Sequence, residues 1–250
     1  ILAIAACLGA VSCSDRAVKP AIPSDPQIEK AVEKTLAKMT LEEKVGQMTE
    51  IGIDILGHFE GDNWVMDVDK VENAIGKYKV GSILNTPVVG QTPEKWQEII
   101  GLIQEVSMRE LGIPCVYGLD MNHGASYVMG ATYFPQNINV GASFNPQLAY
   151  EAGVITAYES RASNCPWTYC PTVDLSRDPR WSRVWENYGE DPLLNAVIGS
   201  AAVRGLQGED PNHVGPENIA VSVKHYMGYG HPRTGKDRTP AYIPVSELRE

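Results

Sequence analysis

The sequence predicts an α/β fold, a (β/α)8 TIM-like barrel that is incomplete at its C-terminus. Short apolar runs of strand length alternate along the chain with longer stretches of helical periodicity, which is the pattern of a parallel sheet covered by helices. The short runs are apolar nearly throughout, as in strands buried on both faces. Polar side chains follow three of them, at Asp120, in residues 177–190 and at Lys224-His225. In a (β/α)8 barrel this edge of the sheet carries the active site.

Four segments have the spacing of amphipathic helices. They are residues 27–48, 94–111, 145–160 and 191–206. Within residues 27–48, Thr40 is followed three residues later by Glu43. This spacing is typical of a helix N-cap, so we expect the segment to divide into two helices, the second beginning after Thr40. Asn145 and Asp191 each precede a proline, which favours a cap followed by the first helical position. We expect the last of these helices to end near Gly208.

The predicted strands alternate with these helices. They are residues 80–84, 113–120, 168–174 and 218–224. Pro171 weakens the prediction for the third strand, because proline lacks the N–H group that a central strand donates. Residues 243–250 have the pattern of a helix start, so the chain is read as a fragment whose barrel continues beyond it.

Composition narrows the classes of ligand. The chain has 21 basic and 31 acidic residues, a net charge of −10, which argues against nucleic acid and anionic lipid surfaces. It has no glycine-rich phosphate loop and no paired CxxC zinc motif, and we therefore expect neither a cofactor nor a metal. Cys165 and Cys170 are close enough in sequence for a disulfide, whereas Cys115 is expected to be buried and unpaired.

The first residues resemble an export signal. Residues 1–12 are apolar and too short to span a bilayer, and small residues precede Cys13 as in a bacterial lipobox. We therefore divide the chain into a partial signal peptide at 1–13 with Cys13 as the lipidated residue, a polar tether at 14–27 and a truncated barrel domain at 28–250. An ordinary secretory signal with an incidental cysteine is the alternative. In both cases the protein is exported, to the periplasm or as an outer-membrane lipoprotein of a Gram-negative bacterium.

The densest group of functional side chains lies in residues 177–192. This stretch holds three arginines, four carboxylates and three aromatic side chains. Guanidinium and carboxylate groups hydrogen-bond sugar hydroxyls, and aromatic rings cover the C–H faces of a pyranose. A surface loop held together by ion pairs has the same composition. Trp181 and Trp185 accordingly fit either a sugar platform or the core. The side chains expected to hold the loop or start the next helix are Arg177, Arg180, Glu186 and Asp191.

Four ordered motifs resemble the N-terminal barrel domain of glycoside hydrolase family 3. They are residues 38–48, residues 118–124 with 130–135, residues 178–183 with 188–192, and residues 223–226. The resemblance spans roughly residues 30–250, and ordered motifs are far more specific than any one of them alone. Residues 228–240 lack the Asp-Ser-His-like element of the N-acetylhexosaminidase branch. The resemblance therefore favours the multi-domain β-glucosidase and β-xylosidase side of the family.

The resemblance implies roles for four substrate-binding residues. Asp120 would accept hydrogen bonds from two hydroxyls of the innermost sugar, Arg183 and Lys224 would donate to neighbouring hydroxyls, and His225 would donate or accept. Taken singly, Asp120 also fits a loop cap or a structural ion pair. Lys224-His225 also fits a buried pair between lysine and a carboxylate.

The family reaction implies an exo-acting retaining β-glycosidase, most simply a β-glucosidase. Such an enzyme removes terminal non-reducing β-linked sugars from oligosaccharides by double displacement. Nothing in residues 1–250 matches the family's nucleophile motif, so the nucleophilic aspartate and the acid/base glutamate are expected beyond Glu250. This fragment alone is therefore expected to be inactive and to contain no catalytic residue.

Two other functions fit part of the sequence. A non-catalytic sugar-binding lipoprotein of an uptake system would explain the export signal and the sugar-compatible loops. A metal-dependent barrel hydrolase would use His123, His225 and His231, but no HxH pair or close cluster of histidines and carboxylates supports it. The membrane is expected as a partner only through the lipid anchor.

Overall fold

The computed structural model describes residues 24–249. These residues divide after Thr40 into two units, residues 24–40 and residues 41–249. In the first unit, α1 (Pro26–Leu36) begins at Asp25, whose carboxylate accepts hydrogen bonds from the backbone N–H groups of Gln27 and Ile28. The second unit begins with α2 (Leu41–Gln47), so the predicted division of residues 27–48 into two helices is confirmed. The predicted signal peptide, Cys13 and most of the predicted tether lie outside the described residues.

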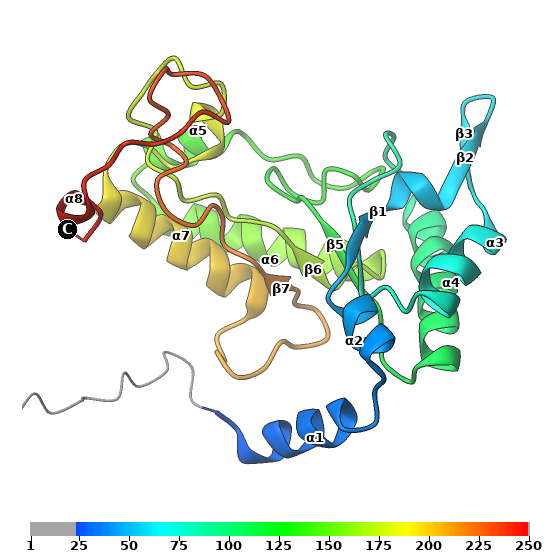
Figure 1. The fold of residues 1–250 in the computed structure, drawn as a ribbon. Coiled ribbons are helices and arrows are strands. Elements are labelled where there is room, and N and C mark those ends of the chain that lie inside the picture. The colour runs from blue at the N-terminus through cyan, green and yellow to red at the C-terminus, as the bar shows by residue number, and fades with distance from the viewer. Residues whose placement is uncertain (1–23, 250) are drawn as a thin grey trace, which may run out of the picture. The chain divides into compact units, whose positions relative to one another are not determined.

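The second unit is built on a five-stranded parallel sheet (Figure 1). Its strands, in spatial order, are β1 (Glu50–Gly52), β4 (Ser82–Leu84), β5 (Val116–Leu119), β6 (Trp167–Thr168) and β7 (Ala220–Val221). Each strand pairs with the next one in this order. A sheet wound in one direction belongs to the (β/α) barrel class, because the strand order of a doubly wound sheet reverses. The α/β prediction is therefore confirmed, although the five strands do not by themselves close a barrel.

An antiparallel hairpin branches off between β1 and β4. Its strands are β2 (Gly57–Glu60) and β3 (Asn63–Met66). It follows a short helix, η1 (Ile53–Leu56), and precedes α3 (Val68–Val71) and η2 (Glu72–Lys77). The sequence analysis predicted none of these elements, nor β1. Most of the hairpin is exposed, with buried Trp64 as its main core contact, so it lacks the apolar run that identified the other strands.

The long helices match their predicted segments closely. They are α4 (Pro93–Glu110), α6 (Pro146–Ala162) and α7 (Pro192–Gln207), accompanied by the shorter α5 (Asn137–Ala142) and α8 (Val245–Leu248). Asn145 and Asp191 are N-caps, as predicted, and each accepts a backbone N–H of the first turn. Helix α7 ends at Gly208, where a φ of 92° suits glycine. One face of the sheet packs against these helices in a core that includes Ile83, Trp96, Ile103, Tyr117, Leu119 and Leu206.

Helices α6 and α7 lie side by side (Figure 1) and approach closely through small residues. A Cβ atom on Gly205 would overlap the carbonyl oxygen of Tyr150, and one on Gly153 would lie 2.8 Å from the carbonyl oxygen of Ala202. Backbone atoms occupy the space that a side chain would need. The distance between the two helices therefore depends on glycine at these positions.

Replacement of Gly205 by alanine should separate these helices. Because the obstructing atoms belong to the backbone, we expect Gly205→Ala to lower the free energy of unfolding by about 1–3 kcal/mol. Gly101 is the matched control, since it lies within α4 and a Cβ atom there would meet nothing within 4 Å. Gly101→Ala should stabilise the chain by about 0.5–1 kcal/mol. Urea denaturation checks both values, and equal effects of the two changes would contradict this account of the packing.

The predicted third strand is shorter than expected, because proline interrupts it. Strand β6 ends at Thr168, and a cis peptide bond joins Cys170 to Pro171. Pairing with the neighbouring segment resumes beyond the proline, where the Val173 N–H donates to the carbonyl oxygen of Lys224 over 2.8 Å. The chain is therefore extended again at the position from which the polar side chains of the site project.

The three cysteines of the described region are free and buried. The disulfide that the spacing of Cys165 and Cys170 allowed is not formed. Their thiols instead lie 3.3 Å from two different carbonyl oxygens, those of Trp167 and Met121. Cys115 is unpaired, as expected. Burial raises the pKa of each of the three thiols to about 12.

These thiols should resist alkylation in the folded protein. With a pKa of about 12, roughly one thiol in ten thousand is ionised at pH 8. We expect iodoacetamide to leave Cys115, Cys165 and Cys170 unmodified under native conditions and to modify all three after unfolding. Peptide mapping by mass spectrometry distinguishes them from the cysteines near the N-terminus. Rapid native labelling of any of the three would contradict their buried placement.

Candidate functional site

Asp120 and Lys224 form an ion pair at the C-terminal edge of the sheet. Asp120 follows β5 directly, and Lys224 lies three residues beyond the end of β7. The Lys224 Nζ lies 2.6 Å from the Asp120 Oδ1, and both side chains are partly buried. Strand β6 separates β5 from β7, so the two backbones are roughly 10 Å apart and the long lysine side chain spans that distance. The contact therefore joins two strands that are not neighbours.

Asn122 links this ion pair to the loop after β6. Its Nδ2 donates to the Asp120 Oδ1 over 3.2 Å, and its Oδ1 accepts a hydrogen bond from the Thr172 hydroxyl, also over 3.2 Å. Both bonds on Asp120 reach the same oxygen. The orientation of the carboxylate is thus set from two directions.

His225 is held by a second carboxylate. Its Nδ1 lies 2.7 Å from the Oδ2 of Asp174, whose side chain is almost fully buried while the histidine remains partly accessible. The Asp174 N–H in turn donates to the Asn187 Oδ1 over 3.1 Å. Because the ring nitrogen bound to Asp174 is occupied, Nε2 is the histidine atom available to a ligand.

Arg183 is held by a third carboxylate, that of Glu186. Two guanidinium nitrogens, Nε and Nη2, each lie 2.6 Å from a different Glu186 oxygen, the two-bond geometry in which arginine and a carboxylate interact most strongly. Only 5% of Glu186 is exposed. Hydrogen bonding to this carboxylate raises the pKa of Arg183 further above its ordinary value. The guanidinium is therefore charged at neutral pH.

Arg183 and His225 line the same hollow, of about 450 Å³. Tyr229 lies between them: its ring centroid is 5.5 Å from the Arg183 guanidinium and 4.6 Å from the His225 ring. Since His225 directly follows Lys224, the four residues predicted from the sequence form one connected group at this edge of the sheet. The sequence analysis missed three residues that contact them, Asn122, Asp174 and Tyr229, and Asp237, which hydrogen-bonds to Tyr229.

The loop of residues 177–192 contains the ion pairs that its composition suggested. Arg180 pairs with Asp178 over 2.7 Å and holds the pKa of that carboxyl at about 2. Trp181 is buried in the loop, whereas 41% of Trp185 is exposed. Trp181 thus belongs to the core, and only Trp185 is accessible enough to serve as a sugar platform.

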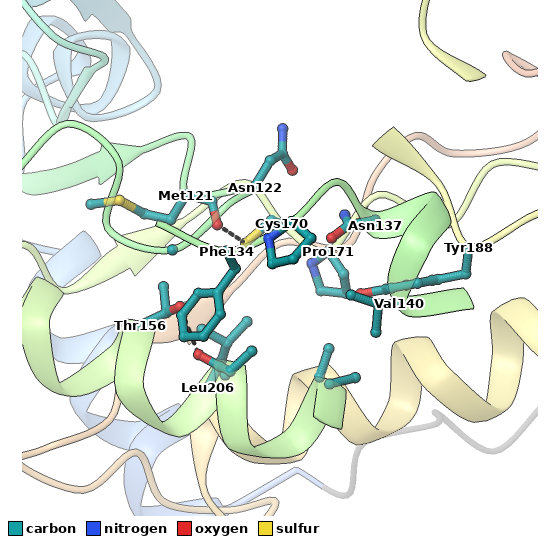
Figure 2. A pocket seen from close by; sticks show the side chains of 16 residues that line it. Met121, Asn122, Phe134, Asn137, Val140, Thr156, Cys170, Pro171, Tyr188 and Leu206 are labelled. Atoms are coloured by element: carbon teal, nitrogen blue, oxygen red, sulfur yellow. Dashed lines mark hydrogen bonds between the residues drawn. The ribbon is translucent and has the colours of Figure 1, made fainter. Parts of the chain in front are cut away.

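A smaller cavity of about 50 Å³ lies between the loops after β5 and β6 and helices α5, α6 and α7 (Figure 2). Apolar side chains such as Phe134, Val140 and Leu206 line most of it, and the Asn122 side chain points away from them. This volume suits one or two water molecules. The cavity is therefore a packing defect rather than a place for a sugar.

The histidines do not gather in one place. His123 is buried beside the rings of Trp185 and Tyr133, at 5.4 and 5.8 Å, and burial lowers its pKa. His225 binds Asp174, and His231 is exposed in the following loop. Within residues 24–249, no group of three or more histidine, cysteine or acidic side chains is placed to hold a metal ion. No helix among these residues is both long and apolar enough to cross a bilayer.

A parallel sheet wound in one direction, with paired carboxylates and cations at its C-terminal edge, defines a TIM-barrel-like α/β domain with its site at the usual face. The family model for the glycosyl hydrolase family 3 N-terminal domain matches residues 40–250. The chain belongs to this family.

Curated relatives and solved structures agree with this assignment. The chain is 38% identical over 231 residues to a lysosomal β-glucosidase of Dictyostelium discoideum, covering 87% of this chain and 28% of that protein. It is 32% identical over 216 residues to a periplasmic β-glucosidase of Salmonella typhimurium, covering 86% and 25%. The crystal structure of an exo-1,3/1,4-β-glucanase from a Pseudoalteromonas species matches with a TM-score of 0.80 at 34% identity, covering 91% and 28%. The chain thus spans about a quarter of the length of these relatives.

Removal of the carboxylate that pairs with Arg183 should destabilise the domain. Because Glu186 is buried and makes two charge-assisted hydrogen bonds, we expect Glu186→Gln to lower the free energy of unfolding by about 1–3 kcal/mol. Glu98 is a matched control: it also pairs with a cation three residues away, Lys95, but 68% of its side chain is exposed. Glu98→Gln should change the stability by less than about 0.5 kcal/mol. Urea denaturation measures the free energy of unfolding of both variants. Equal losses in the two would contradict burial as the cause of the difference.

Proposed function

We propose that this chain is the sugar-binding part of an exo-acting retaining β-glycosidase, a β-glucosidase, that removes terminal non-reducing β-linked sugars from oligosaccharides. The observation that carries this proposal is the Asp120–Lys224 ion pair, with Arg183 and His225 lining one hollow beside it. Family membership and the β-glucosidases among the relatives support the same reaction. The nucleophilic aspartate and the acid/base glutamate belong, in this proposal, to sequence beyond Glu250.

The geometry suits a sugar because each polar group is held before the ligand arrives. Lys224 and Asn122 both bind Oδ1 of Asp120, which leaves Oδ2 to accept hydrogen bonds from hydroxyls. Lys224 and Arg183 provide donors, and His225 provides Nε2. A carboxylate accepts, a cation donates and a sugar hydroxyl does both. Asp120, Arg183, Lys224 and His225 are therefore the proposed substrate-binding residues.

These residues would contribute to catalysis by orienting the sugar ring. In double displacement, a carboxylate attacks the anomeric carbon, and a second carboxylic acid protonates the leaving oxygen and then activates water. Hydrogen bonds to the hydroxyls hold the anomeric carbon in line with these carboxylates, in the bound ground state as well as in the transition state. The four residues would thus lower the barrier without exchanging a proton or forming a bond with the anomeric carbon.

The proposed location is the cell envelope. One relative is a periplasmic β-glucosidase, and the apolar segment before Cys13 has the pattern of an export signal with a lipidation site. We therefore propose an exported protein, in the periplasm or anchored in the outer membrane through a lipid on Cys13. Its partner would be a β-glycoside or oligosaccharide, with the lipid chain as its contact with a membrane.

Hydrolysis of nitrophenyl α- and β-glycosides tests the proposal. We expect the full-length protein to hydrolyse β-glucosides, and the 250-residue chain to be inactive because it lacks the two catalytic carboxylates. Lys224→Met in the full-length protein should lower kcat/KM by about 100-fold or more, since Asp120 and the sugar both lose a cation. Lys236→Met is the control, because Lys236 is exposed in a nearby loop and does not line the hollow.

The outcome separates the enzyme from its main alternative. If the full-length protein hydrolyses no glycoside but binds monosaccharides in calorimetry, the chain belongs to a non-catalytic sugar-binding lipoprotein. Equal activity of Lys224→Met and Lys236→Met would instead remove Lys224 from the site.

A further inference from the structure

We propose that Tyr229 and Asp237 are positioning residues that hold Arg183 and His225 in the orientation needed to bind the sugar. This proposal rests on the proposed function, because it assumes that Arg183 and His225 contact the substrate. Neither Tyr229 nor Asp237 is expected to touch the reacting atoms.

The Tyr229 ring contacts both side chains at once. The Arg183 guanidinium lies 5.5 Å from the ring centroid, and the His225 ring meets it edge-on at 4.6 Å with an interplanar angle of 69°. Arginine over an aromatic face and edge-to-face ring pairs are both favourable contacts. These two residues come from different loops, those after β6 and β7, and Tyr229 is a direct contact common to both. A shift of this ring would therefore move both sugar-binding groups together.

The Tyr229 ring is itself fixed through its hydroxyl. The hydroxyl donates to the Asp237 Oδ1 over 2.6 Å, and the same oxygen accepts a hydrogen bond from the Trp181 Nε1 over 2.9 Å. Trp181 is 2% exposed and meets the Tyr229 ring at a centroid distance of 5.3 Å. Asp237 thereby joins the loop after β7 to the buried part of the loop that contains Arg183. Hydrogen bonds from Tyr229 and Trp181 lower the pKa of Asp237, so the acceptor is ionised at neutral pH.

Arg183 needs this support because Glu186 alone does not determine its direction. Glu186 holds Nε and Nη2, and both groups are on the same short helical turn, η3 (Val184–Glu186) with Arg183 as its N-cap. Because Arg183 and Glu186 lie on the same turn, a movement of the loop would carry both side chains together and change the direction of the guanidinium. Tyr229 contacts the guanidinium from a different segment of the chain and restricts that change of direction.

Four variants of the full-length protein test this role. Tyr229→Phe removes only the hydroxyl, Asp237→Ala removes the acceptor, Asp237→Asn keeps an oxygen acceptor, and the fourth variant combines Tyr229→Phe with Asp237→Ala. Tyr242→Phe is the matched control, because Tyr242 lies on the same loop, is 64% exposed and has no hydroxyl hydrogen bond among the described residues.

We expect the effect to appear in KM for a nitrophenyl β-glucoside more than in kcat, because ground-state and transition-state binding are weakened alike. KM should rise about 3- to 10-fold in Tyr229→Phe and about 10- to 30-fold in Asp237→Ala, with kcat within about 3-fold of the unchanged protein. The double variant should resemble Asp237→Ala, since both changes break the same link. Asp237→Asn and Tyr242→Phe should stay within about 2-fold.

A purely structural role would give a different result. It would lower the melting temperature and the active fraction of each variant and leave KM unchanged, and that outcome overturns the proposal. Additive effects in the double variant would overturn it too. If Asp237→Ala does not fold, the comparison of KM between Tyr229→Phe and Tyr242→Phe tests the proposal instead. An unchanged KM in both variants would then contradict it. If the unchanged protein neither hydrolyses nor binds sugars, the proposed function fails and this proposal fails with it.

Discussion

The contact between Lys224 and Asp120 organises the site, because it joins β7 to β5 across the end of β6. It depends on the one-directional winding of the sheet, which places the carboxyl ends of successive strands at one edge. It also depends on the resumption of pairing after Pro171, where the Val173 N–H binds the Lys224 carbonyl oxygen. That bond and the one from the Lys224 N–H to the Pro171 carbonyl oxygen, over 3.2 Å, fix the backbone from which Lys224 and its neighbour His225 project.

Two of the four proposed sugar-binding groups, His225 and Arg183, are each oriented by a carboxylate that is buried more deeply than the group itself. Asp174 holds His225, and Glu186 holds Arg183, in both cases with the carboxylate less exposed than the group that it orients. Desolvation of these carboxylates is offset because each makes short, charge-assisted hydrogen bonds. The accessible ends of the side chains are thus directed outward by interactions that solvent reaches poorly.

The long helices and most of the strands could be predicted from the sequence because their signals are local. Asp191 before Pro192 predicts a helix start wherever the segment lies in the fold. The hairpin at residues 57–66 could not be predicted, since its stability comes from pairing between two mostly exposed strands. Similarly, Asp120, Arg183, Lys224 and His225 were predicted through motifs, whereas Tyr229 and Asp237 lie beside Arg183 and Trp181 through contacts over long sequence distances. Periodicity contains no signal for such contacts, and a tyrosine in a loop is ordinary in composition.

Each of the two permanent cations at the site has its own carboxylate, Asp120 for Lys224 and Glu186 for Arg183. Their charges therefore cancel locally, although the chain as a whole is acidic. An uncharged sugar can enter such a site without displacing counter-ions, so its affinity should depend little on ionic strength. An ionised sugar, such as a uronate, would have to compete with a resident carboxylate for the same donors. The carboxylates already present thus select against anionic sugars, independently of the shape of the pocket.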